Sequence, residues 1–249
     1  MLTPLAQLVL FCTTAMAQVP KDLPLAADVY IDSKGNKLPY RLLKPKNYDP
    51  KKKYPLVLFL HGAGERGTDN KKQLIHGIGD FVRNQDKYPC FVVVPQCPAG
   101  QTWADWRYKG PQPKEPTLPT KLSLQLVEQI QKKYSIDDKR LYITGLSMGG
   151  FGTWDVICRY PDKFAAAVPI CGGGDPRLAE KIKDLPIWAF HGAKDRAVKP
   201  ERSRLMIEAI KKAGGKPKYT EYPDVGHAAW VPAYRDQKLF EWLFSQKRP

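Results

Sequence analysis

The stretch that decides the fold is LYITGLSMGGFGTWD, residues 141–155. A short apolar run ends at a cluster of glycines around one serine, and a segment with helical character follows. Residues 145–149 read Gly-Leu-Ser-Met-Gly, the Gly-x-Ser-x-Gly pattern in which the serine occupies a sharp turn between a strand and a helix. Glycines are needed there because larger side chains would collide with neighbouring backbone. The pattern predicts that Ser147 is a nucleophile presented at the end of a strand.

The rest of the chain alternates between short apolar runs and helical patterns. The apolar runs cover residues 55–62, 90–96, 141–145, 164–173, 186–192 and 218–223, and two further strands flank the turn at 33–36. The helical patterns cover residues 122–134, 151–160, 200–215 and 233–246. The middle runs are apolar throughout, as expected for strands that are buried on both faces. We therefore expect an α/β fold: a mostly parallel sheet of about eight strands, with helices on both faces and no large cap domain.

The length and the N-terminal sequence indicate one domain that is preceded by a leader peptide. The chain has 249 residues, of which 43% are hydrophobic and 26% charged, as in globular proteins. Residues 1–17, MLTPLAQLVLFCTTAMA, carry no charge and end in a small-x-small cleavage pattern. They predict a signal peptide that is removed before Gln18, leaving 18–249 as the catalytic domain of a secreted or periplasmic protein. A plain N-terminal helix is the alternative, and the run is too short to span a membrane.

The formal net charge of +15 raises the question of an acidic partner. The lysines are dispersed or lie in loops such as KPKNYDPKKKY, residues 44–54, and no RNA-binding or helix-turn-helix signature is present. We interpret the charge as a solvated basic surface and expect no nucleic-acid partner. Attraction to acidic polysaccharide or an anionic cell wall is the alternative.

A serine nucleophile needs a histidine to accept its proton and an acid to orient that histidine. In proteins with this motif the acid and then the histidine follow the serine along the chain. His227, in YPDVGHAAW after the last predicted strand, is the expected base, whereas His191 is expected to belong to a hydrogen-bond network at a strand end. Asp195, at the end of WAFHGAKD, is the expected acid, with Asp224 as its competitor.

The attack of the serine creates an oxyanion, which needs two N–H donors. One is expected to be the backbone N–H of Met148, directly after the serine. The other is expected in LHGAGERG, residues 60–67, where Ala63 is the preferred donor and Gly64 the second choice. We expect Glu65 and Arg66 to hold this loop in place.

Four cysteines follow the predicted leader: Cys90, Cys97, Cys158 and Cys171. No two of them have the spacing of a structural zinc site, so we expect no such site. Export permits disulfides, and four cysteines allow three pairings. Cys97 and Cys171 both lie near carboxyl ends of predicted strands, which leaves open a disulfide near the site.

Five motifs, in this order, carry a resemblance: LFLHGAGERG, GLSMGGFGTWD, FAAAVPICGGGD, PIWAFHGAKD and YPDVGHAAW. They span nearly the whole predicted mature chain. The chain resembles α/β-hydrolases, and more narrowly the small secreted esterases of carbohydrate esterase family 1, poly(3-hydroxybutyrate) depolymerases and phospholipase/carboxylesterases. Chains of this kind are often labelled prolyl oligopeptidase family or predicted peptidase.

The resemblance implies a serine carboxylesterase with a Ser147–His227–Asp195 triad and an acyl-enzyme mechanism that uses neither metal nor cofactor. It implies acetyl or feruloyl esters on plant polysaccharide as substrates. Trp103 and Trp106, in the long loop 98–119, and Trp230, after the histidine, are candidates to stack on a sugar or phenolic ring; core or surface packing is the alternative for each.

Two other functions stay open. One is a small serine peptidase of prolyl oligopeptidase type, although the chain has no room for the propeller domain of those enzymes. The other is a non-catalytic polyanion-binding protein on a hydrolase fold, which is disfavoured because all three triad members stand at the expected places. A lipase is also disfavoured, because no amphipathic lid with a broad apolar face is found.

Overall fold

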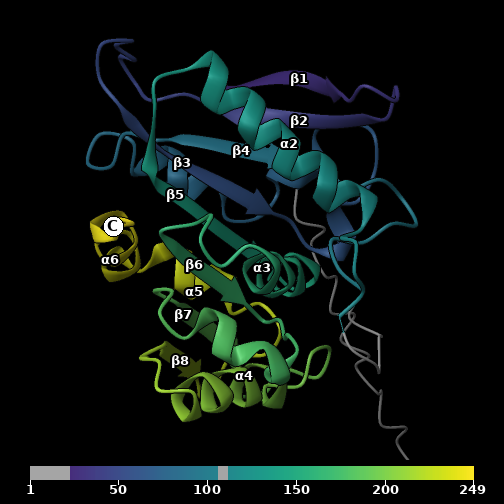
Figure 1. Ribbon diagram of the computed structural model, residues 1–249, viewed down its shortest axis with the longest axis vertical. Helices are drawn as coiled ribbons and strands as arrows, with labels where there is room; N and C mark the ends of the chain where they lie inside the picture. The colour runs from purple at the N-terminus through teal and green to yellow at the C-terminus, as the bar shows by residue number, and fades with distance from the viewer. Residues whose placement is uncertain (1–22, 106–111) are drawn as a thin grey trace, which may run out of the picture.

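The computed structural model describes residues 23–105 and 112–249 (Figure 1). Its centre is an eight-stranded sheet with the order β1-β2-β4-β3-β5-β6-β7-β8. β2 pairs antiparallel with β1 and β4, and the neighbours from β4 to β8 pair in parallel. The strands are β1 (Leu25–Ile31), β2 (Lys37–Leu43), β3 (Tyr54–Leu60), β4 (Phe91–Pro95), β5 (Ile136–Leu146), β6 (Ala166–Ile170), β7 (Trp188–Gly192) and β8 (Lys218–Tyr222). The predicted mostly parallel sheet of about eight strands is confirmed.

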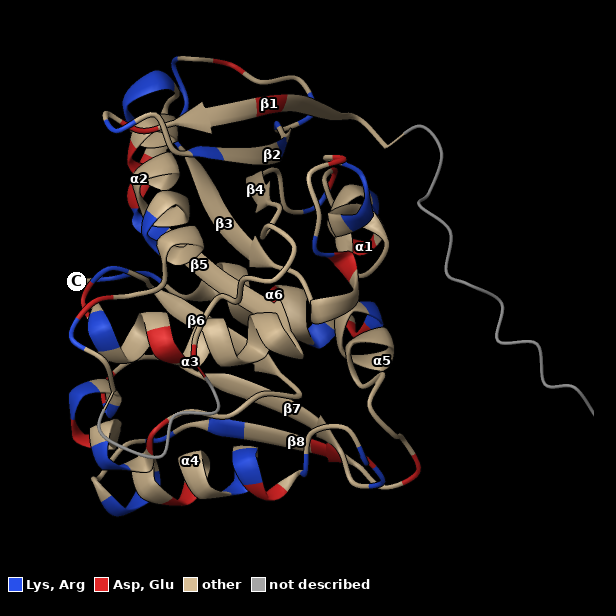
Figure 2. Cartoon of the chain, turned by 90° about the vertical axis from the view of Figure 1, so that its right-hand side faces the viewer, with Lys and Arg blue, Asp and Glu red and all other residues tan. Residues whose placement is uncertain are grey.

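Helices cover both faces of this sheet, so that α2, α3 and α4 lie on one side and α1 and α5 on the other (Figure 2). The helices are α1 (Ile78–Arg83), α2 (Leu118–Lys133), α3 (Met148–Arg159), α4 (Glu201–Lys212), α5 (Trp230–Arg235) and α6 (Gln237–Ser245). Three 3₁₀ turns complete the described elements: η1 (Ala63–Glu65), η2 (Lys72–Leu74) and η3 (Pro176–Ile182). The alternation of strands and helices places the carboxyl ends of the parallel strands along one edge of the sheet.

The core consists of two hydrophobic clusters, one on each face of the sheet. In β3, Leu56, Leu58 and Leu60 belong to the cluster beneath α2, α3 and α4. Val57 and Phe59, which alternate with them, belong to the cluster beneath α1, α5 and α6. Every residue of β3 is buried because successive side chains point to opposite, equally covered faces. This explains why the central strands are apolar throughout.

The last predicted helix, residues 233–246, is two helices in the structure. The chain leaves α5 at Asp236, which has an extended backbone, and Asp236 then caps α6 by accepting the N–H of Lys238. An aspartate with this bonding pattern favours a helix start over a helix interior. Helix α1 was not predicted, and β5 begins five residues earlier than the apolar run suggested.

The four cysteines after the predicted leader are all buried free thiols: Cys90, Cys97, Cys158 and Cys171. The disulfide left open between Cys97 and Cys171 is therefore not formed. Cys97 sits beneath the loop after β3, where its N–H donates to the ring of His61, and Cys171 donates its thiol hydrogen to the carbonyl of His227. Two of the predictions, the signal peptide at residues 1–17 and a substrate contact of Trp106, concern residues outside those that the structure describes.

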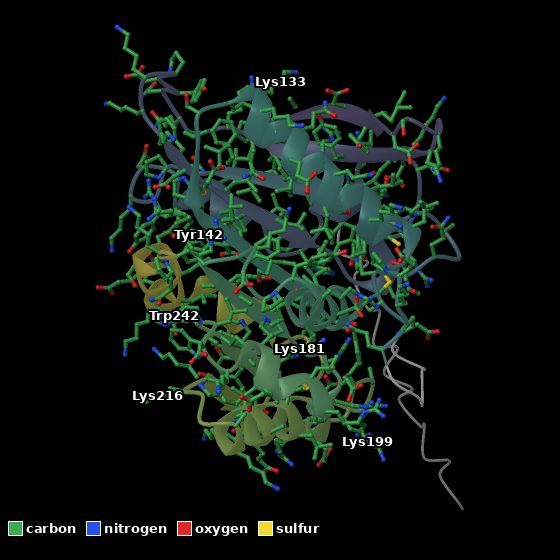
Figure 3. All side chains as sticks on the ribbon, viewed as in Figure 1. Lys133, Tyr142, Lys181, Lys199, Lys216 and Trp242 are labelled. Carbon is green, nitrogen blue, oxygen red and sulfur yellow. The ribbon has the colours of Figure 1, made fainter. Side chains whose placement is uncertain are left out.

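The basic residues are spread over the surface of the described chain (Figure 2). Lys133, Lys199 and Lys216 lie at separate places around the outline of the molecule (Figure 3). Within residues 23–105 and 112–249, no helix combines the length and the apolar character needed to cross a bilayer.

Candidate active site

Ser147 occupies the turn between β5 and α3, at the carboxyl edge of the sheet. Its backbone angles, φ 53° and ψ −116°, are strained for a non-glycine residue. The flanking glycines make the turn possible: a Cβ on Gly149 would lie 1.9 Å from the carbonyl oxygen of Leu60, and a Cβ on Gly145 would lie 2.3 Å from that of Gly149. Helix α3 thus packs directly against the backbone of β3, with the serine at its N-cap.

His227 and Asp195 complete a hydrogen-bonded chain with this serine. The Nε2 atom of His227 lies 2.9 Å from Ser147 Oγ, and its Nδ1 atom lies 2.7 Å from Asp195 Oδ2. His227 lies between β8 and α5, and Asp195 follows β7, so three separate strand ends bring the side chains together. Because the carboxylate only accepts, Nδ1 carries the proton and Nε2 is free to accept one from the serine.

The structure separates the two candidate acids. The side chain of Asp195 is fully buried beside His227, whereas Asp224 is 86% exposed and pairs with Lys194. Burial alone would raise the pKa of Asp195, but hydrogen bonds from His227, Val198 and Ala197 outweigh it, so this pKa lies below its usual value. Asp195 is therefore a carboxylate at neutral pH.

His191 also contacts Asp195, and it belongs to a hydrogen-bond network at the strand end, as predicted. Its Nδ1 atom lies 2.8 Å from Ser203 Oγ, and its Nε2 atom lies 2.9 Å from the carbonyl oxygen of Val198 and 3.2 Å from Asp195 Oδ2. Nε2 therefore carries a proton, which both oxygens share. Burial lowers the pKa of His191, in spite of these acceptors, so it is a neutral donor to Asp195.

This network also decides whether the cluster of Cys171, His191 and Asp195 suits a metal ion. The three ligand atoms lie within 4.8 Å of one another. Nε2 of His191 is protonated, however, and burial raises the pKa of the Cys171 thiol to about 12. Metal ligation needs a free imidazole lone pair and a thiolate, so this donor set does not fit a metal.

The two predicted oxyanion donors begin two helical segments. Met148 is the first residue of α3, and Ala63 is the first residue of η1. The first N–H groups of a helix have no acceptor within it and are available to an anion. Arg66 fixes the η1 loop by donating Nε–H to the carbonyl of Ala63 at 2.9 Å, as predicted for a residue that holds this loop.

His61 also helps to hold the η1 loop in place. Its Nδ1 atom lies 2.6 Å from the carbonyl oxygen of Gly62, and its Nε2 atom accepts the N–H of Cys97 at 2.9 Å. Burial lowers the pKa of His61 to about 4, so the ring is neutral. His61 therefore joins the end of β3 to the chain after β4.

The prediction that Trp103 stacks on a substrate is wrong. Its side chain is completely buried, its indole N–H donates to the carbonyl of His61 at 2.9 Å, and its ring packs against that histidine. Trp103 is thus part of the core beneath the loop. The ring of Trp230 lies 5.2 Å from that of His227, edge to face, which places it beside the site.

A cavity of about 360 Å³ adjoins helix α3 on the side of α4. Its lining includes Phe151, one helical turn after Ser147, together with Asp155, Asp175 and Arg202. The cavity therefore combines apolar surface with charged side chains of both signs, close to the turn that carries the serine.

A nucleophile turn at this edge of an eight-stranded sheet, with a hydrogen-bonded histidine and aspartate from later strand ends, defines the α/β-hydrolase class. The family model described as "Putative esterase" matches residues 32–228, so the chain belongs to this esterase family. The chain is also similar to a solved structure titled as a thermostable esterase, with 43% identity, a TM-score of 0.84, and coverage of 90% of this chain and 63% of the other.

Two curated relatives add detail. The bifunctional acetylxylan esterase/xylanase XynS20E of Neocallimastix patriciarum is 29% identical over 61% of this chain and 20% of its own length. Carboxylesterase SOBER1 of Arabidopsis thaliana is 25% identical over 69% of this chain and 82% of its own length. The chain spans between 20% and 28% of the length of the first three curated relatives that it matches.

Proposed function

We propose that the protein is a secreted serine carboxylesterase that hydrolyses ester bonds through an acyl-enzyme on Ser147. The observation that carries the proposal is the unbroken hydrogen-bonded chain from Ser147 through His227 to Asp195. Membership of the esterase family supports the same reaction class. Secretion rests on the leader predicted at residues 1–17.

In this mechanism Ser147 Oγ attacks the ester carbonyl carbon as His227 Nε2 takes its proton. The negative charge of the tetrahedral intermediate is bound by the N–H groups of Met148 and Ala63. The intermediate collapses, and the alcohol leaves with the proton from Nε2. Water then attacks the acyl-enzyme by the same route and releases the acid. Asp195 stays ionised throughout and stabilises the imidazolium that forms in each half.

The proposed substrates are acetyl or feruloyl esters on plant polysaccharide. The acetylxylan esterase relative supports an acetyl group on xylan. The cavity beside α3 supports a large, polar alcohol portion, because charged side chains such as Asp155 and Arg202 line it and suit sugar hydroxyls. Trp230, next to His227, is a second surface for a ring of the substrate.

The test is a rate comparison on residues 18–249 with p-nitrophenyl acetate, methyl ferulate, acetylated xylan and a peptide p-nitroanilide. We expect the esters to be cleaved and the Ser147→Ala variant to lose at least about 10³-fold in kcat. The ratio of ferulate to acetate cleavage reports the preferred acyl group. Cleavage of the peptide alone would show that the protein is a peptidase and not an esterase. Equal rates in the wild type and Ser147→Ala would show that Ser147 is not the nucleophile.

A further inference from the structure

A buried carboxylate lies beside the active site without a cation to balance it. Glu65 ends the η1 turn, is 7% exposed, and its Oε2 atom is buried with no hydrogen-bond partner among the described residues. No Lys or Arg of the described chain pairs with it; the nearest basic atoms are His76 Nε2 at 3.7 Å and His61 Nδ1 at 4.0 Å. Burying such a group costs several kcal/mol unless the charge is compensated.

Neither neighbouring histidine supplies that charge. His61 is neutral, because burial lowers its pKa to about 4 and its Nε2 already accepts the N–H of Cys97. Burial also lowers the pKa of His76. For Glu65 itself, burial raises the pKa, while the N–H groups of Gly62 and Glu65 and the nearby His227 oppose the rise. The carboxylate is therefore held at a net cost to the fold.

Contacts connect Glu65 to the serine and the histidine by two routes. On one side, a Cβ on Gly62 would lie 2.8 Å from Glu65 Oε2 and 3.6 Å from Ser147 Cβ, so the carboxylate packs under the turn that faces the nucleophile. On the other side, the His76 ring lies 5.4 Å from that of Trp230, which in turn lies 5.2 Å from that of His227. Together these contacts form one wall of the active site.

We propose that Glu65 is a positioning residue, whose buried side chain supports the Gly62–Ala63 turn that donates to the oxyanion. The proposal rests on the proposed ester hydrolysis and deepens it. The side chain would serve the turn, since an acidic residue at the third position of a helix stabilises its N-terminus.

The other titratable and charged groups around Glu65 are His61, Arg66 and His76. They enter the interpretation of any pH dependence of stability.

The first test separates charge from shape with Glu65→Gln and Glu65→Ala. In Glu65→Gln, kcat should stay within about threefold of the wild-type value, because the amide keeps the shape of the side chain. In Glu65→Ala, kcat should fall about tenfold with KM nearly unchanged, because the oxyanion donor loses its support.

Asp224→Asn is the matched control. Asp224 lies three residues from His227 in the chain, but it is 86% exposed and paired with Lys194. Solvent screens such a charge, so kcat and KM should not change. A Glu65→Ala variant with wild-type kcat would overturn the role of Glu65 in the turn.

One readout does not depend on turnover. Since burial raises the pKa of Glu65, its cost is absent below the unfolded pKa and present above the folded one. Glu65→Gln should therefore raise Tm by about 2–4 °C at pH 7.5 but not at pH 4.

These readouts keep the two proposals separable. A wild-type protein that cleaves no ester, but whose Tm rises in Glu65→Gln at pH 7.5 and not at pH 4, would overturn the proposed function and keep the buried charge. An active wild-type protein, with no gain in Tm in Glu65→Gln and no fall in kcat in Glu65→Ala, would overturn the role of Glu65 alone.

Discussion

At the residue scale, the proposed chemistry depends on which nitrogen of His227 carries the proton. Asp195 Oδ2 accepts from Nδ1, which leaves Nε2 to face Ser147. Asp195 is fixed in turn by the N–H groups of Ala197 and Val198, each at 2.9 Å from Oδ1, and by His191. The acid is therefore rigid, and its lowered pKa keeps it charged at neutral pH.

Asp195→Asn should keep the fold and lose the correct tautomer. An amide can donate to Nδ1 and hold the proton on Nε2, where it faces the serine. We expect kcat to fall by about 10⁴-fold with little change in KM. Steady-state kinetics with p-nitrophenyl acetate measure the loss, and Asp224→Asn serves as the control with unchanged kcat. A loss below tenfold would show that Asp195 does not orient the base.

Part of the site, but not all of it, could be predicted from the sequence. The pattern around Ser147 and the strand-end positions of Asp195 and His227 predicted three side chains that the structure brings together. The contact of Glu65 with His76 was not predictable, because it depends on the path of the loop after β3, where no periodicity applies. The burial of Trp103 was equally hidden, because a tryptophan in a loop has the same sequence signature whether its ring faces solvent or the core.

At the element scale, the site depends on the close packing of α3 against β3. A Cβ on Gly149 would lie 1.9 Å from the carbonyl oxygen of Leu60, so no side chain fits there. The strands themselves were predicted well, since burial on both faces requires continuous apolar runs. The helix ends were predicted less well: Asp236 divides α5 from α6, and only its capping bond to Lys238 marks the break.

Gly149→Ala should therefore displace α3 and the serine together. Its Cβ would lie 1.9 Å from backbone that cannot move without β3. We expect a loss of more than about 4 kcal/mol in the free energy of unfolding, or insoluble protein. Gly79→Ala in α1 is the control, because its Cβ would meet only the flexible end of Arg83 at 3.3 Å. Denaturant unfolding compares the two, and equal stability would contradict the packing described.

At the scale of the whole molecule, buried titratable groups set how stability depends on pH. Burial lowers the pKa of His61, His76 and His191, so that each resists protonation in the folded state. Unfolding exposes them and lets them bind protons. Stability from these groups is present above the unfolded histidine pKa and is lost as pH falls. Glu65 acts in the opposite direction, because its pKa is raised.

His61 dominates this balance, because its pKa is lowered to about 4. The pKa of an unfolded histidine is about 6.5, so acidification from pH 7 to pH 4.5 should lower the free energy of unfolding by about 2–3 kcal/mol through His61. Guanidinium unfolding at the two pH values measures the change. A His61→Gln variant should be less stable at pH 7 but should lose less on acidification. Wild-type stability that is equal at both pH values would contradict a neutral, buried His61.

Labelling by an irreversible organophosphate ester, followed by peptide mass spectrometry, tests directly whether Ser147 is the activated nucleophile. We expect one adduct, on Ser147, absent from Ser147→Ala and formed at least about 10³-fold more slowly in His227→Ala, because the serine then lacks its base. An adduct on another serine, or a labelling rate that does not depend on His227, would contradict the proposed triad.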